Sequence, residues 1–90
     1  MADFQVKLRN NTVNGKWRSL CVELPEPMER LTKYLEENPQ DRLRSNGKLK
    51  KLKGKLQGIL QYDLTDRYRV HYRVDTIERI VYVEYIGQHP

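Results

Sequence analysis

The stretch that decides the fold lies at residues 68–74 and reads Tyr-Arg-Val-His-Tyr-Arg-Val. Aromatic and β-branched side chains alternate there with polar ones at a period of two residues. That period predicts a β-strand with one buried face. The buried row is expected to consist of Tyr68, Val70, Tyr72 and Val74. The opposite face would carry three arginines and a histidine in line, namely Arg67, Arg69, His71 and Arg73.

Two apolar segments flank this strand at the distance of short turns. Residues 59–64 include Ile59, Leu60, Tyr62 and Leu64, and residues 80–86 are almost all β-branched or aromatic. With turns at 65–67 and 75–78, the three segments are expected to form an antiparallel meander. The apolar character of 80–86 predicts a central strand that is covered on both faces.

The first half of the chain predicts one strand and two helices. Residues 4–8 alternate like a strand. Apolar residues between 13 and 24 have helical spacing, with Asn11 or Thr12 as the cap, although the pair Asn14-Gly15 leaves a hairpin as the alternative. A second helix is expected at 25–37, because prolines are tolerated in a first turn and Asn38-Pro39 would end it.

The predicted order is therefore β-α-α-β-β-β. This is an α+β fold in which a small antiparallel sheet packs against two N-terminal helices, and residues 1–90 suffice for a single domain. The intervening residues 42–58 contain three glycines and are expected to form mostly loop.

Several classes of protein are excluded by composition. The single cysteine, Cys21, excludes an internal disulfide and a cysteine zinc site, and a lone cysteine is usually a small core residue. No apolar run approaches the roughly 20 residues of a membrane span, and the N-terminus lacks a signal pattern. We therefore expect a cytoplasmic protein with no membrane partner. Phosphate-binding glycine motifs and metal-ligand spacings are also absent from the sequence, so we expect no cofactor and no metal.

Positive charge is concentrated in one segment. The net charge is +5, and residues 42–55 hold seven basic residues and no acid, which leaves ten basic against twelve acidic residues elsewhere. Such a segment favours a polyanion or an acidic protein surface, although a solvated loop is the simpler alternative. We predict nucleic-acid contacts for Lys48, Lys50, Lys51, Lys53, Lys55, Arg67 and Arg73.

The polar row of residues 67–73 also suggests chemistry. Arg69 could hold a phosphate with two hydrogen bonds and stabilise charge that grows during phosphoryl transfer. The alternative is that these arginines pair across strands with Asp63, Glu78 or Glu84. Cleavage of RNA through its 2′-hydroxyl needs a base and an acid, for which imidazole is suited, and the two histidines are His71 and His89.

Most aromatic side chains have the spacing of core residues. Tyr62 and Tyr85 are the two expected to be free to stack on bases.

Three segments together resemble a known family. They are Lys51-Leu52-Lys53-Gly54, the run 68–74 and Val81-Tyr82-Val83-Glu84-Tyr85-Ile86-Gly87. Their pattern is similar to that of the RelE/ParE superfamily of bacterial toxin–antitoxin toxins, over roughly residues 20–90. The resemblance implies a small antiparallel sheet on two N-terminal helices. RelE-like members cleave messenger RNA in the ribosomal A site, ParE-like members poison DNA gyrase, and an antitoxin neutralises both.

The resemblance also implies roles for individual residues. Arg69 matches the arginine that stabilises the transition state, and His89 matches a general acid or base placed just after the last strand. Glu84 is a second candidate acid or base, and the lysines from Lys48 to Lys55 would grip RNA phosphates. The chain departs from the family at Leu60 and Tyr62, where some members carry two lysines, and it lacks the tyrosine found after the last strand.

The predicted function is thus a toxin that acts as a ribosome-dependent, metal-independent endoribonuclease on messenger RNA. The alternatives are a non-enzymatic inhibitor of DNA gyrase and a catalytically inactive, basic RNA-binding module. The expected partners are messenger RNA, the ribosome and a short, acidic, partly disordered antitoxin that folds on contact.

Overall fold

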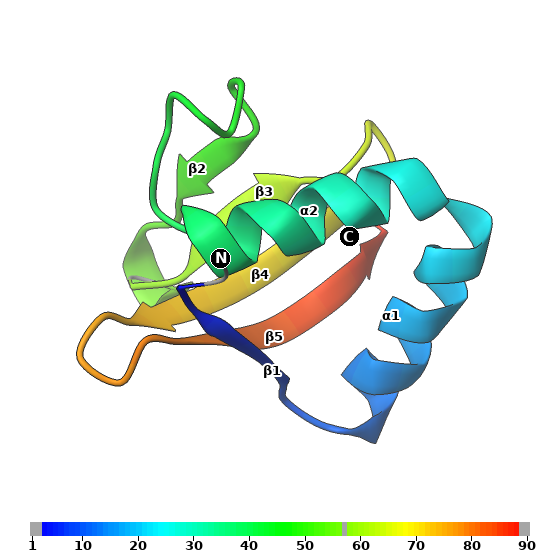
Figure 1. Cartoon of the computed structure of the whole chain (residues 1–90), viewed down its shortest axis with the longest axis horizontal. Helices are drawn as coiled ribbons and strands as arrows, with labels where there is room; N and C mark the ends of the chain where they lie inside the picture. The colour runs from blue at the N-terminus through cyan, green and yellow to red at the C-terminus, as the bar shows by residue number, and fades with distance from the viewer. Residues whose placement is uncertain (1–2, 57, 89–90) are drawn as a thin grey trace.

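Two helices and a five-stranded sheet make up the computed structural model, which describes residues 3–56 and 58–88 (Figure 1). The strands are hydrogen-bonded in the order β1-β5-β4-β3-β2. The elements are β1 (Gln5–Leu8), α1 (Asn11–Glu23), α2 (Pro25–Glu37), β2 (Leu49–Lys51), a 3-10 turn η1 (Gly54–Leu56), β3 (Leu60–Asp63), β4 (Tyr68–Asp75) and β5 (Ile80–Gln88). The α+β fold and the antiparallel meander β3-β4-β5 are confirmed.

Two edge strands complete the sheet. β1 pairs in parallel with β5, so that residues 5–8 lie beside residues 80–83. At the other edge β2 pairs antiparallel with β3. The prediction that 42–58 is mostly loop missed this strand, because three residues are too few to show a period. Leu49 anchors β2 by packing into the core opposite Tyr62, while Lys50 and Lys51 leave a charged edge that discourages further strand pairing.

Both helices lie within a residue or two of their predicted bounds. α1 is capped by Asn10, whose side-chain Oδ1 accepts a hydrogen bond from the backbone N–H of Val13 at 2.9 Å. The cap therefore precedes the predicted Asn11 or Thr12. Asn14 and Gly15 lie inside the helix, so the hairpin alternative is wrong. α2 begins at Pro25 and ends at Glu37 as predicted.

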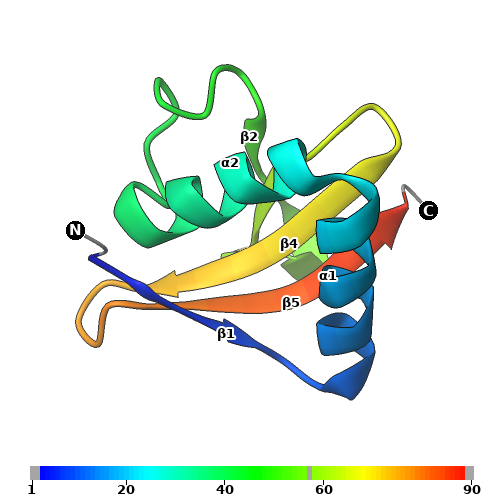
Figure 2. The same cartoon turned by 45° about the vertical axis from the view of Figure 1, so that its right-hand side comes forward.

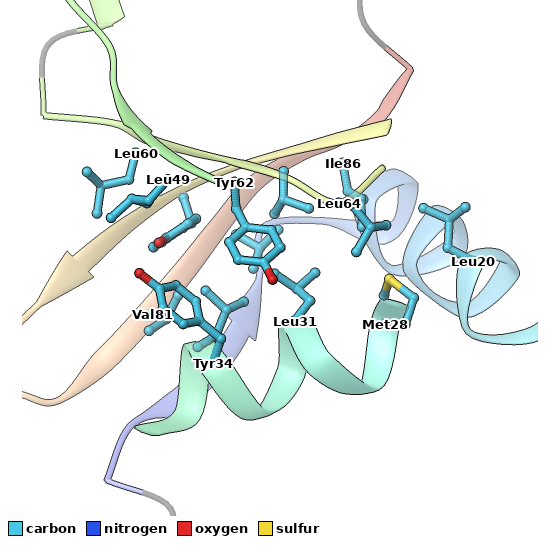
Figure 3. Packing of buried hydrophobic residues seen from close by; sticks show 14 of the residues in the cluster. Leu20, Met28, Leu31, Tyr34, Leu49, Leu60, Tyr62, Leu64, Val81 and Ile86 are labelled. Carbon is cyan, nitrogen blue, oxygen red and sulfur yellow. The ribbon is translucent and has the colours of Figure 1, made fainter. Parts of the chain in front are cut away.

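The helices pack on one face of the sheet (Figures 1 and 2). Figure 3 shows Met28, Leu31 and Tyr34 of α2 pointing toward side chains of the strands. Tyr72 of β4 is fully buried and donates a hydrogen bond from its hydroxyl to the carbonyl of Pro39 at 2.6 Å. Burial raises the pKa of this phenol well above its ordinary value, so the hydroxyl stays a donor.

Two predictions about coverage are wrong. β5 is an inner strand, but only its helix-facing side is covered, and Tyr85 on the other side is 40% exposed. Cys21 is exposed rather than buried. In α1 the neighbouring Leu20 takes the core position, and Cys21 lies about 100° further around the helix, on its exposed side.

An extra residue interrupts the ladder between β4 and β5. His71 pairs with Tyr85 whereas Tyr72 pairs with Val83, so Glu84 has no partner of its own and forms a β-bulge. Val81 and Val83 point to the core before the bulge, and Ile86 does so after it. The bulge thus leaves both Glu84 and Tyr85 on the open face of the sheet.

Candidate functional site

The face of the sheet that the helices do not cover carries four of the predicted site residues, Lys50, Arg69, Arg73 and Glu84. The register brings β2, β3, β4 and β5 side by side there, with Lys50 beside Gln61, Gln61 beside His71, and His71 beside Tyr85. We call this surface the open face. Its principal side chains are Lys50, Gln61, Asp63, Arg69, His71, Arg73, Tyr82, Glu84 and Tyr85.

Asp63 is the centre of a polar network on β3. Its carboxylate lies 3.3 Å from Lys50 Nζ, accepts a hydrogen bond from Gln61 Nε2 at 3.0 Å, and lies 3.5 Å from Arg69 Nε. Asp63 and Arg69 are opposite residues in the β3–β4 ladder, so the cross-strand pairing considered for Arg69 is present. The side chains of this pair are each 25% exposed, and 3.5 Å is long for a charge-assisted hydrogen bond.

His71 is held from two sides. Its Nε2 lies 3.0 Å from Gln61 Oε1, and its ring centre lies 5.5 Å from that of Tyr85 at an interplanar angle of 50°. Burial lowers the pKa of the His71 imidazole, and the nearby charge of Arg69 lowers it further. Both effects disfavour the imidazolium, so the ring is neutral at neutral pH.

Glu84 is bound by two arginines. Its carboxylate lies 2.7 Å from Arg73 Nε and 3.5 Å from Arg9 NH1, and its side chain is 18% exposed. The guanidinium of Arg73 also lies over the ring of Tyr82, 5.5 Å from its centre. Arg73, predicted to contact nucleic acid, and Glu84, predicted as an acid or base, therefore contact each other.

Residues 42–55, which we call the basic segment, border the open face. Lys50, Lys51, Lys53 and Lys55 are exposed, and Lys48 is half-buried. Lys48 and Arg69 line one pocket of about 280 Å³ together with Asp63, Asp66 and Thr65. Arg67 is exposed in the adjoining turn. The structure thus joins part of the basic segment to Arg69, but two carboxylates share the same pocket.

The two positions matched to the family's lysines need correction. Leu60 and Tyr62 both point into the core, and Tyr62, which is only 5% exposed, packs against Tyr34 with ring centres 5.2 Å apart. Tyr62 is therefore not free to stack on a base, whereas Tyr85 is exposed. The outward positions of β3 belong to Gln61 and Asp63, which sequence reasoning missed. Strict alternation from Leu60 and Tyr62 would have placed them there.

The remaining predicted residue, His89, lies outside the described residues. The hydroxyl of Tyr85 donates a hydrogen bond to the backbone carbonyl of Gln88 at 2.9 Å, at the end of β5.

Over residues 3–56 and 58–88, no group of three or more histidine, cysteine, aspartate or glutamate side chains is placed to hold a metal ion. Within the same part of the chain, none of the helices has the length and apolar character needed to cross a membrane.

Comparison with known proteins gives similarity in structure but not in sequence. No protein-family model and no curated protein sequence matches the chain. Among solved structures, the toxin–antitoxin complex RelBE2 from Mycobacterium tuberculosis contains a chain that is 18% identical, with a TM-score of 0.64 and coverage of 97% of this chain and 99% of that one.

Two further structures agree with that similarity. The YoeB/ParE toxin from Agrobacterium tumefaciens is 16% identical with a TM-score of 0.70, and the alignment covers 97% of this chain and all of that one (100%). The archaeal RelE–RelB complex from Pyrococcus horikoshii contributes a chain that is 24% identical, with a TM-score of 0.65 and coverage of 96% and 94%. This chain therefore shares the fold of these solved RelE and YoeB/ParE toxins, and in this chain the two helices cover one face of the sheet and leave the other open.

Proposed function

We propose that this protein is the toxin of a toxin–antitoxin pair and that it cleaves messenger RNA on the ribosome with the open face of its sheet. The observation that carries the proposal is the row Arg69–His71 on β4, which lies next to exposed Tyr85 and is bordered by the basic segment. The fold, which it shares with chains solved as toxin–antitoxin complexes, supports the same function.

Arg69 is the residue assigned to the scissile phosphate. A guanidinium can form two hydrogen bonds to phosphate and stabilise the charge that develops in the transition state. In the free protein Arg69 lies beside Asp63, but the pair is partly exposed and long. The long separation makes this contact weaker than a bidentate pair, so the guanidinium keeps hydrogen-bond donors for a phosphate.

The other predicted residues take supporting roles. Lys48, Lys50, Lys51, Lys53 and Lys55 would contact the RNA backbone or ribosomal RNA, with Arg67 and Arg73 at the ends of the same row. His89 would donate a proton to the leaving oxygen. Glu84 remains a candidate acid or base, although its two arginine contacts give it a structural role as well.

The proposal also includes the partners. The substrate is messenger RNA in the ribosome, and the protein acts in the bacterial cytoplasm without a metal or cofactor. Its inhibitor is a short, acidic, partly disordered antitoxin that is attracted by the positive charge of the basic segment and folds on contact.

Induced expression with mapping of RNA 5′ ends tests the function. Wild type should arrest growth and shorten messages at codon-spaced positions, and purified protein should cleave a message only when ribosomes are present. Arg69→Ala should reduce cleavage by roughly 10²-fold or more, as expected for a lost donor to transition-state charge. Arg18→Ala is the matched control, because Arg18 is an exposed arginine on α1. Intact messages with inhibited gyrase would instead select the gyrase-inhibitor alternative.

A second candidate is an RNA-binding module that does not cleave. The engagement of both Arg69 and Arg73 with carboxylates favours it, because paired arginines are less available to a transition state. In that case expression should be harmless, messages should stay intact, and RNA affinity should fall steeply with salt.

A further inference from the structure

We propose that His71 is the general base of this site, and that Gln61 and Asp63 hold its ring in the tautomer that leaves Nδ1 free to accept a proton. This inference rests on the proposed function, because a base is needed only if RNA is cleaved. It assigns a group to the proton-accepting step, for which Arg69 and the basic segment offer no side chain.

The orientation of the Gln61 amide follows from its neighbour. An ionised carboxylate can only accept hydrogen bonds, and Asp63, with Lys50 and Arg69 beside it, is such an acceptor. The Gln61 nitrogen must therefore face Asp63, at 3.0 Å. The amide oxygen Oε1 then faces His71.

The tautomer of His71 follows in turn. An amide oxygen can only accept, so Nε2 of His71, 3.0 Å away, must be the donor. A neutral imidazole with its proton on Nε2 carries a lone pair on Nδ1. Burial and Arg69 keep the ring neutral, so it can accept a proton. The charged or titratable groups that share its face are Lys50 from β2, Asp63 from β3, Arg69 and Arg73 from β4, and Glu84 and Tyr85 from β5.

The spacing on β4 suits the reaction. Residues two apart on a strand share a face and lie roughly 6.5–7 Å apart, which is the scale of a ribose and its phosphate. With the phosphate on Arg69, Nδ1 of His71 would remove the proton of the 2′-hydroxyl. The 2′-oxygen then forms a bond to phosphorus, and the bond between phosphorus and the 5′-oxygen breaks.

The step is balanced without a further reactant. The leaving 5′-oxygen keeps the bonding electron pair and takes a proton from an acid, for which His89 or water serves. The products are a 2′,3′-cyclic phosphate and a 5′-hydroxyl end. The imidazolium of His71 then returns its proton to solvent.

The tautomer can be measured without activity. Long-range ¹H–¹⁵N NMR of the full chain should show His71 with its proton on Nε2. Gln61→Leu removes the acceptor and should increase the share of the Nδ1–H form. A wild-type ring protonated on Nδ1 would overturn the proposal, since the base position would be occupied.

The kinetic test uses a substitution that keeps the contact with Gln61. In His71→Gln an amide replaces Nε2 and can still donate, but it cannot act as a base. Cleavage should fall by roughly 10²–10⁴-fold while RNA affinity and thermal stability stay near wild type. His71→Asn serves as a second variant if His71→Gln does not fold, and Arg18→Ala remains the control.

A pH profile separates a positioning role of Gln61 from a structural one. Wild-type activity should fall on the acid side as His71 gains a proton. Gln61→Glu adds a negative charge beside the ring, so this acid limb should move to higher pH. The assignment would be overturned if the acid limb of the pH profile does not move in Gln61→Glu. It would also be overturned if His71→Gln still shows that limb.

The outcomes distinguish the two proposals. If wild type cleaves no RNA, both the proposed function and the base role fail. If Arg69→Ala is inactive but His71→Gln cleaves like wild type, the function stands and only the base role fails.

Discussion

The two faces of β4 carry side chains of opposite character. Val70 and Tyr72 on one face are fully buried beneath the helices. Arg69, His71 and Arg73 on the other face contact only the side chains of adjacent strands, within the part of the chain described. One face is stabilised by packing, and the other by pairwise polar contacts that depend on strand register. The same strand therefore carries stability on one side and candidate chemistry on the other.

The largest effect should come from changing the register itself. Deleting Tyr82 would shift Ile80 and Val81 by one position relative to β4. Each of these side chains would then point to the opposite face of the sheet, because a one-residue slip exchanges the two faces. The variant should not fold, as judged by circular dichroism and thermal unfolding.

Deleting Glu84 is the matched control, because it removes only the bulge. Val83 would still pair with Tyr72 and Tyr85 with His71, so the core would keep its pattern. This variant should fold and lose only the contacts of Glu84 with Arg73 and Arg9. If both deletions prevent folding equally, then Glu84 is not an extra residue that can be removed without changing the register.

The next largest effect comes from comparing substitutions at two adjacent residues of β4 that point to opposite faces of the sheet. Tyr72→Ala should lower the free energy of unfolding by about 3–5 kcal/mol, because it empties a fully buried aromatic site. His71→Ala, one residue away, should cost about 1 kcal/mol or less, since the ring is only half-buried. Urea denaturation measures both, and similar losses would mean that the open face also carries the fold.

A smaller effect comes from removing the Tyr72 hydroxyl, which contacts both Pro39 and Tyr34. Tyr72→Phe keeps the ring but leaves the carbonyl of Pro39 without the donor that lies 2.6 Å away. The loss in unfolding free energy should be about 1–3 kcal/mol. Urea denaturation measures this loss, with Tyr85→Phe as an exposed control. If the contacts of the Tyr72 hydroxyl contribute nothing, the two variants should lose the same unfolding free energy.

The smallest effect is a pH dependence that comes from the open face. Because burial and Arg69 lower the folded-state pKa of His71 below 6.5, the unfolded chain binds protons more readily. Stability should therefore fall as pH falls from 6.5 through the folded-state pKa, and should not change from this group above 6.5. Denaturation of wild type and His71→Gln at a series of pH values isolates the contribution. A slope that persists in His71→Gln belongs to another group.

The covered face was predictable from sequence because burial imposes a period. The alternation at 68–74 and the spacing in 25–37 gave β4 and α2 with accurate bounds. The open face was harder, because its contacts depend on which residues the register places opposite each other. Asp63 was considered as a partner for the arginines, whereas Gln61 and its contact with His71 were not. The bulge at Glu84 leaves no mark in the sequence, yet it decides that Tyr85 lies beside His71.

The parallel pairing of β1 with β5 joins residues near the two ends of the chain and links folding to synthesis. β1 has no partner until residues 80–83 have been made, and until then β4 lacks one of its two neighbours. Contacts so distant in sequence close late. A nascent chain that stops before residue 80 should thus stay unfolded, which circular dichroism of a fragment of residues 1–79 would show.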